Sequence, residues 1–176
     1  MLTAEQKAHF DTFGFLVLRQ LFSAAETEKL AGEYDEIMDE DRESRPFKGE
    51  GQSVQPFVEK RGRLLELAED DRVYTTVEEL LGPGFVWVGC VGNYYVGDTP
   101  WHADGLQSNI DPDLSDWHYP MVKVGFYLDP VAKDTGCLRV IPGSHKSPYA
   151  DGLAPLSGRN PDPGYLPFGV SPTEIP

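Results

Sequence analysis

The residues with the clearest capacity for metal chemistry are a histidine and an aspartate two positions apart, His102 and Asp104. An imidazole and a carboxylate at this spacing can reach one cation if the backbone between them is extended and bends. With a further histidine from elsewhere, such a pair forms the facial triad of non-haem Fe(II) oxygenases, which leaves positions open for a cosubstrate and O₂. The pair alone is a weak signal, because a loop histidine and a turn aspartate fall at this spacing by chance in many proteins.

Composition limits the classes of partner. The chain has 176 residues and a formal net charge of −14, and 40% of its residues are hydrophobic, which is typical of one globular domain. The excess of acid argues against binding to nucleic acid and to anionic membrane surfaces. No apolar run reaches 18 residues and the first residues lack the pattern of a signal peptide, so we expect no membrane span and a cytoplasmic protein. Cys90 and Cys137 lie in apolar runs, which favours core thiols over a disulfide.

The first half of the chain carries helix signals. Capping boxes at Thr3–Gln6 and Ser23–Glu26 predict two helices, the first ended by Gly14 and the second reaching about Asp41. Residues 42–59 are charged and contain prolines and glycines, which predicts a long loop, either a lid over a site or a plain surface excursion. Apolar spacing then predicts helices over residues 64–68 and 71–81.

The second half changes to β character. Apolar or alternating runs predict strands at residues 15–18, 85–91, 121–128 and 137–141. From residue 148 onward prolines and glycines are too frequent for regular structure, which predicts a loop or tail. We therefore expect an α+β domain with a mainly β core, divided into a helical part (1–82), strands carrying the metal motif (83–147) and a Pro/Gly-rich tail (148–176).

Four segments, read together, resemble the phytanoyl-CoA dioxygenase family. They are residues 10–18, 101–105, 123–129 and 136–146, and the most specific is Gly-Cys-Leu-Arg-Val-Ile-Pro-Gly-Ser-His-Lys at 136–146. The resemblance implies a double-stranded β-helix (a cupin-like jelly roll) behind N-terminal helices. It also implies Fe(II), 2-oxoglutarate and O₂ as cofactors, hydroxylation of a C–H bond, and His102 and Asp104 as iron ligands.

Two details refine what the resemblance implies. Related halogenases replace the carboxylate ligand by a small residue, so Asp104 favours hydroxylation of a small-molecule or acyl substrate. Family members also carry a third ligand, a histidine on a late strand, followed by an arginine that holds 2-oxoglutarate. Neither follows residue 146 in the expected pattern, so we expect the jelly roll to be incomplete at its C-terminal side.

Further site candidates each have a structural alternative. Asn93 and Tyr95 precede the metal motif and can contact cosubstrate or substrate, or be ordinary strand positions. Lys123 can pair with a carboxylate of 2-oxoglutarate or face solvent. His145 can supply a third metal ligand, although a structural role in its turn is the simpler interpretation. Trp101 can form a wall of the site or simply pack beside a turn.

Three functional hypotheses remain open. The first is an Fe(II)/2-oxoglutarate-dependent dioxygenase. The second is a non-catalytic jelly-roll binding module, or a truncated fragment, that retains the ligand pair. The third is a cupin-like metal enzyme that uses His145 with His102 and Asp104. The Pro-Gly-Ser-His block favours the first hypothesis over the third.

Overall fold

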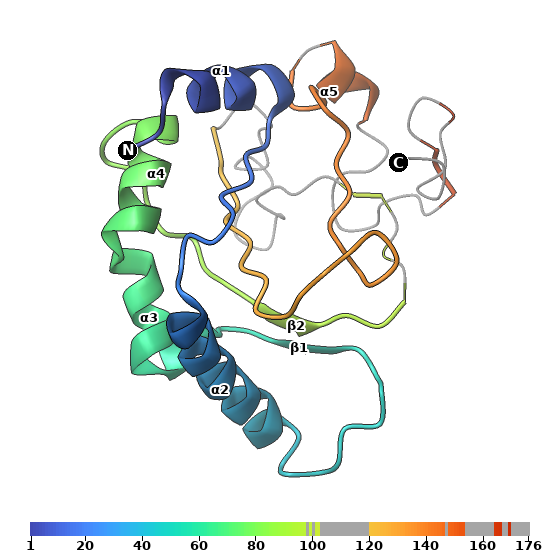
Figure 1. Ribbon diagram of the computed structural model, residues 1–176. Helices are drawn as coiled ribbons and strands as arrows, with labels where there is room; N and C mark the ends of the chain where they lie inside the picture. The colour runs from blue at the N-terminus through green and yellow to red at the C-terminus, as the bar shows by residue number, and fades with distance from the viewer. Residues whose placement is uncertain are drawn as a thin grey trace. The chain divides into compact units, whose positions relative to one another are not determined.

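The computed structural model describes residues 1–97, 99, 101–102, 120–146, 148–153, 164–166 and 169 (Figure 1). The chain forms two compact units, which are described separately. The first consists of Met1, Leu18–Gly97 and Phe126–Val131, and the second of Leu2–Val17, Asp98–Gly125 and Ala132–Pro176. The first unit contains α2 (Ala24–Asp41), β1 (Gln52–Val54), the 3₁₀ helix η1 (Val58–Lys60), α3 (Gly62–Glu69), α4 (Asp71–Leu81) and β2 (Gly92–Tyr94). The second contains α1 (Ala4–Phe13) and α5 (Tyr149–Gly152).

The predicted helices and their caps are confirmed. At the start of α1 the Gln6 side chain accepts from the Thr3 N–H at 2.8 Å, while the Thr3 hydroxyl accepts from the Gln6 N–H at 3.1 Å. Ser23 and Glu26 form the same reciprocal pair at the start of α2. Gly14 ends α1 in the left-handed conformation, with φ of 80°. These local hydrogen bonds satisfy backbone groups that a helix end leaves unpaired.

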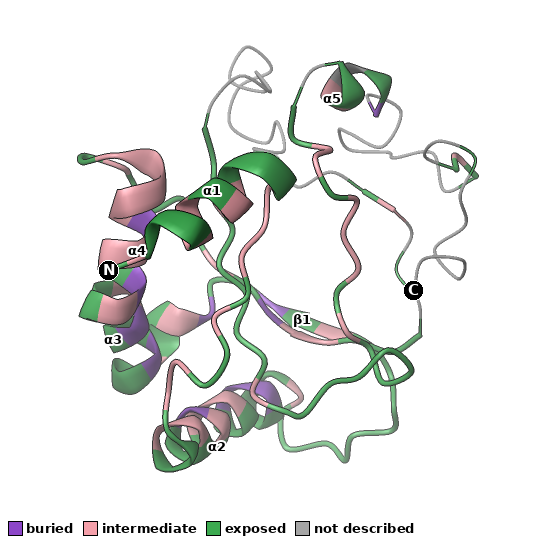
Figure 2. Ribbon diagram, turned by 45° about the horizontal axis from the view of Figure 1, so that its top comes forward, coloured by how far each residue is buried: buried purple, intermediate pink, exposed green. Residues whose placement is uncertain are grey.

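The core of the first unit lies where α2 and α3 meet the antiparallel β1–β2 pair (Figure 2). The apolar stripe predicted for α2 is buried, with Ile37 and Met38 almost fully enclosed. The buried core residues are Leu30, Ile37, Met38, Val54, Phe57, Leu64 and Leu67. Most of them are helical, so helices supply most of this unit's core, where we expected mainly β structure.

The β structure of the described residues is one antiparallel pair, with Gln52 opposite Tyr94 and Val54 opposite Gly92. β2 directly follows the apolar run at residues 85–91 that predicted a strand. β1 lies in the segment 42–59 that was predicted to be a loop, and η1 begins there, so that prediction was wrong for residues 52–54 and 58–59. Charged and glycine residues around β1 give it no strand-like pattern. Its strand character comes from pairing with β2, which lies about 40 residues away in the sequence.

The other predicted strands, at residues 15–18, 85–91, 121–128 and 137–141, have no strand assignment in the described part of the chain. An apolar pattern gives a preference for extended backbone, but a strand also needs a hydrogen-bonded neighbour. One pair is too little to establish a double-stranded β-helix.

Residues 148–153 differ from the predicted loop or tail, because α5 lies there. The Ala150 N–H donates to the Lys146 carbonyl at 2.9 Å, and Pro148 is tolerated at the start because the first turn needs no N–H there. None of the described helices has the length and apolar character that crossing a membrane requires.

Candidate functional site

His102 is described with an exposed side chain in the second unit. Asp104, its predicted co-ligand, lies outside the described residues. Among the residues that are described, no three or more His, Cys, Asp or Glu side chains group in a way that could hold a metal. Convergence of His102 and Asp104 on one cation therefore stays a prediction.

The residue before His102 has an unpaired donor. The indole Nε1 of Trp101 is buried, and it has no hydrogen-bond partner within the described structure. Leaving a buried N–H without an acceptor costs about 1–3 kcal/mol. An acceptor oxygen brought by a bound ligand would remove this cost. From the sequence, Trp101 was expected only to form a wall of the site or to pack beside a turn, because a sequence pattern does not show which donors lack an acceptor.

The weaker candidates are divided between the two units. Asn93 and Tyr95 belong to the first unit. Asn93 lies opposite Ser53 in the β1–β2 pair and is half-buried, whereas Tyr95 is 71% exposed. Lys123 belongs to the second unit and is exposed. These placements agree with ordinary strand and surface positions, and a role in binding stays a prediction for all three.

His145 lies in the turn that follows Pro142, and its imidazole is directed at the end of α1. Its Nε2 is 3.3 Å from the main-chain carbonyl oxygen of Asp11. A carbonyl oxygen only accepts, so Nε2 carries the proton and donates it. This arrangement is the structural role that sequence analysis offered as the alternative to metal ligation.

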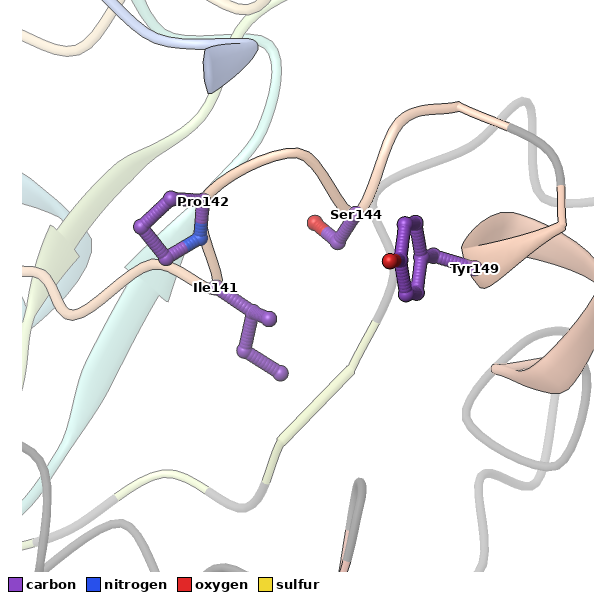
Figure 3. Close-up of a pocket in the computed structure, with 4 residues that line it drawn as sticks. All are labelled: Ile141, Pro142, Ser144 and Tyr149. Atoms are coloured by element: carbon purple, nitrogen blue, oxygen red, sulfur yellow. The ribbon is translucent and has the colours of Figure 1, made fainter.

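The same turn borders a cavity of about 300 Å³ in the second unit (Figure 3). Ile141, Pro142, Ser144 and Tyr149 line it, so its wall combines apolar groups with two hydroxyls. A cavity of this kind suits a small, partly apolar group.

Polar groups of the first unit gather beside the β1–β2 pair, a grouping that the sequence did not predict. The Tyr94 hydroxyl donates to the Asp35 carboxylate at 2.6 Å, and the Arg42 guanidinium lies 5.9 Å from the centre of the Tyr94 ring. Burial, with the hydrogen bond to Asp35, raises the pKa of Tyr94 to about 12. Burial also raises the pKa of Tyr34, whose ring packs against Phe57. Both phenols therefore stay protonated at neutral pH.

The two cysteines are free, as the sequence predicted, but both are half-buried where core positions were expected. The Cys90 Sγ accepts from the Val58 N–H at 3.0 Å and donates to the Glu59 carboxylate at 3.1 Å. Burial raises the pKa of the Cys90 thiol, which keeps it in its unreactive protonated form.

Comparison with known proteins gives one result. A family model described as phytanoyl-CoA dioxygenase (PhyH) matches residues 10–160, a span that contains His102 and Asp104. No curated protein and no solved structure matches the chain. The family implies a cupin-like jelly-roll fold and, in general, an Fe(II)/2-oxoglutarate-dependent oxygenase. Because the match covers most of its length, the chain belongs to the phytanoyl-CoA dioxygenase family.

Proposed function

We propose that this protein is a non-haem Fe(II)/2-oxoglutarate-dependent dioxygenase that hydroxylates a small-molecule or acyl substrate. The observation that carries the proposal is the family match over residues 10–160, within which a histidine and an aspartate stand at the spacing of a ligand pair. Neither residue type nor spacing would suffice without that match.

The residues present fit this cofactor in their chemistry. A neutral imidazole from His102 and a carboxylate from Asp104 are donors of the type that Fe(II) accepts in such sites. The buried Trp101 N–H, directly before His102 and without an acceptor among the described residues, is a donor that a carboxylate or carbonyl oxygen of a bound ligand would satisfy. A site for an anionic keto acid needs such donors as well as metal ligands.

Each residue then has a defined task. With iron bound, His102 would present a neutral ring nitrogen to the metal, and Asp104 would supply negative charge from the same short segment of sequence. At the sequence position of Asp104, related halogenases have a small residue that leaves room for chloride, so the carboxylate favours hydroxylation. When bound, iron together with 2-oxoglutarate and O₂ supplies the oxidising chemistry, and the chain supplies position and exclusion of water.

The substrate is proposed to be a small molecule that is not strongly anionic. The net charge of −14 disfavours approach of a polyanion through long-range repulsion. Repulsion of polyanions is compatible both with a free metabolite and with an acyl group as the substrate.

The test is metal binding and turnover by the 176-residue chain. Anaerobic titration with Fe(II) is followed by measurement of succinate release with 2-oxoglutarate and O₂, which this enzyme class produces even without the main substrate. We expect His102→Ala and Asp104→Ala each to lower Fe(II) affinity by at least about 100-fold and to abolish succinate release. Asp134→Asn, which changes an exposed aspartate in a turn, is the control and should leave both unchanged.

Two results would contradict the proposal. Unchanged Fe(II) binding in both ligand variants would remove His102 and Asp104 from the site. A well-folded wild-type chain that binds neither Fe(II) nor 2-oxoglutarate would instead favour the second hypothesis, a non-catalytic binding module or a truncated fragment that retains the ligand pair.

A further inference from the structure

The turn at residues 142–145 is joined to the end of α1, although more than 130 positions separate them in the sequence. The Gly143 N–H donates to the Phe13 carbonyl at 2.9 Å, and the His145 Nε2 lies 3.3 Å from the Asp11 carbonyl. Both segments belong to the second unit, and Figure 1 shows α1 beside the chain that leads into α5.

These contacts complete the C-terminal cap of α1. A helix leaves its last four carbonyl groups without partners inside the helix. Gly14 donates to the Phe10 carbonyl at 2.8 Å, and the distant turn supplies donors to the carbonyls of Asp11 and Phe13. Three of the four terminal carbonyls therefore have donors, two of which come from the turn.

The His145 imidazole also packs directly against Gly14. Its φ of 80° is left-handed, and a Cβ there would lie 2.8 Å from Cγ and 2.9 Å from Cε1 of His145. Real Cβ contacts are essentially never that short. Only glycine satisfies both the backbone conformation and the close approach of the ring.

We propose that His145 is a positioning residue, whose imidazole holds the turn against α1 and is not a metal ligand. We name the group formed by Asp11, Phe13, Gly14, Gly143 and His145 the α1 latch. Residues of the same turn, Pro142 and Ser144, line the cavity described above together with Ile141 and Tyr149. The α1 latch therefore sets one wall of that cavity, and this holds independently of the proposed oxygenase activity.

The ring chemistry supports this assignment. Nε2 donates to the Asp11 carbonyl, so it has no lone pair for a cation while the bond is made. Nδ1 is the ring atom nearest the position of a Cβ on Gly14, so that edge of the ring faces the glycine. Metal ligation by His145 would require the ring to leave α1.

A set of His145 variants tests the latch. The amide nitrogen of glutamine can take the place of Nε2, whereas that of asparagine takes the place of Nδ1. We expect His145→Gln to preserve hydrogen-exchange protection of the Gly143 amide within about twofold, and His145→Asn and His145→Ala to lower it about five- to tenfold. If His145 were a metal ligand, all three variants would lose metal binding alike, because none of them supplies a nitrogen lone pair.

Titration with Co(II) alone, read by visible absorption, gives an independent measurement. We expect equal absorption in His145→Ala and in the wild type. Unchanged Gly143 protection in all three variants, or loss of Co(II) absorption in both His145→Ala and His145→Gln, would overturn the proposal.

Coupling to Gly14 gives a second test that does not depend on metal. Gly49→Ala is the matched control, since Gly49 has φ of 82° and nothing within 4 Å of an added Cβ. We expect Gly14→Ala to lower the urea midpoint more than Gly49→Ala in the wild type. In the His145→Ala background, Gly14→Ala should lower the urea midpoint no more than Gly49→Ala, because the imidazole that an added Cβ would overlap is absent. Strictly additive effects would show that His145 and Gly14 do not form a latch.

Discussion

At the scale of single residues, the unpaired Trp101 indole is the feature most directly linked to ligand binding. Its Nε1 is buried beside a proposed metal ligand and lacks an acceptor among the described residues. Such a donor destabilises the free protein and becomes favourable once a ligand supplies an oxygen.

The first prediction concerns this indole. Trp101→Phe keeps an aromatic ring but removes the donor, so the free protein should keep its stability or gain about 1 kcal/mol. Affinity for 2-oxoglutarate, measured by calorimetry with a redox-inert divalent metal, should fall about five- to tenfold. Trp87→Phe is the control, because Trp87 is 56% exposed. Equal affinities in both variants would show that the Trp101 N–H does not reach the cosubstrate.

The second prediction concerns Gly92, which is buried in β2. An added Cβ would lie 2.6 Å from Cζ of Phe57, a core residue that is 3% exposed. We expect Gly92→Ala to lower the free energy of unfolding by about 1–3 kcal/mol through overpacking, as measured by urea denaturation. Gly51→Ala, where an added Cβ would lie 3.8 Å from the Tyr94 carbonyl oxygen, should be nearly neutral. A neutral Gly92→Ala would contradict the close packing of β2 against Phe57.

At the scale of elements, Arg72 joins the start of α4 to the start of α2. Its guanidinium donates to Glu26 at 2.9 Å and to Asp70 at 2.7 and 2.8 Å, and its Cζ lies 4.1 Å from the centre of the Phe22 ring. It also donates to the Leu21 carbonyl at 3.1 Å. The planar guanidinium can make these contacts at once, which a lysine ammonium cannot.

This junction predicts a pH dependence of stability. Hydrogen bonds from Arg72, and then from Ser23, lower the pKa of Glu26 to about 2, and those from Arg72 also lower the pKa of Asp70. A depressed carboxyl pKa adds stability above the ordinary value near 4.5, and this is lost as the pH falls toward 2. We expect the urea midpoint of the wild type to fall over this range and that of Glu26→Gln to fall less.

Substitution of the arginine gives the matched comparison. Arg72→Ala should lower the urea midpoint at pH 7 and flatten the acid dependence, and Arg72→Lys should restore only part of both. Arg63→Ala is the control, because its 3.4 Å contact with Glu33 is a surface pair and should contribute little. If Arg72→Ala behaved like Arg63→Ala, the junction would not hold the two helices.

At the scale of the whole molecule, large apolar side chains are exposed along residues 86–96. The most exposed are Val86 at 78%, Tyr95 at 71% and Val88 at 58%. In the described structure residues 86–88 carry no strand assignment, so their backbone has no ladder partner there. Exposed apolar side chains on unpaired extended backbone favour association with other chains.

The fourth prediction follows from this exposure. We expect Val88→Lys to raise the concentration at which the 176-residue chain begins to scatter light by about twofold or more, since a charge opposes edge-to-edge pairing. Val131→Lys adds the same charge at an apolar position outside this run and should have less effect. An equal effect of both variants would point to net charge and not to residues 86–96.

The sequence by itself determined the helices and the family. Helix caps and apolar stripes depend on residues three or four positions apart. The pairs Thr3 with Gln6 and Ser23 with Glu26 therefore predict the starts of α1 and α2 from the local sequence alone. The block at residues 136–146 identified the family for a similar reason, since it is one continuous stretch. His102 and Asp104 were predicted as ligands in the same way, and their convergence remains to be tested.

Tertiary structure decided the contacts that join distant segments. Three sets of contacts link residues far apart in the chain. β1 pairs with β2, Arg72 donates to Glu26 and Leu21, and the His145 ring packs against Gly14. No local pattern carries them, because each depends on loops bringing two surfaces together. For His145 the difference is chemical: a histidine can bind a metal or donate to a carbonyl, and the carbonyl of Asp11 lies within its reach.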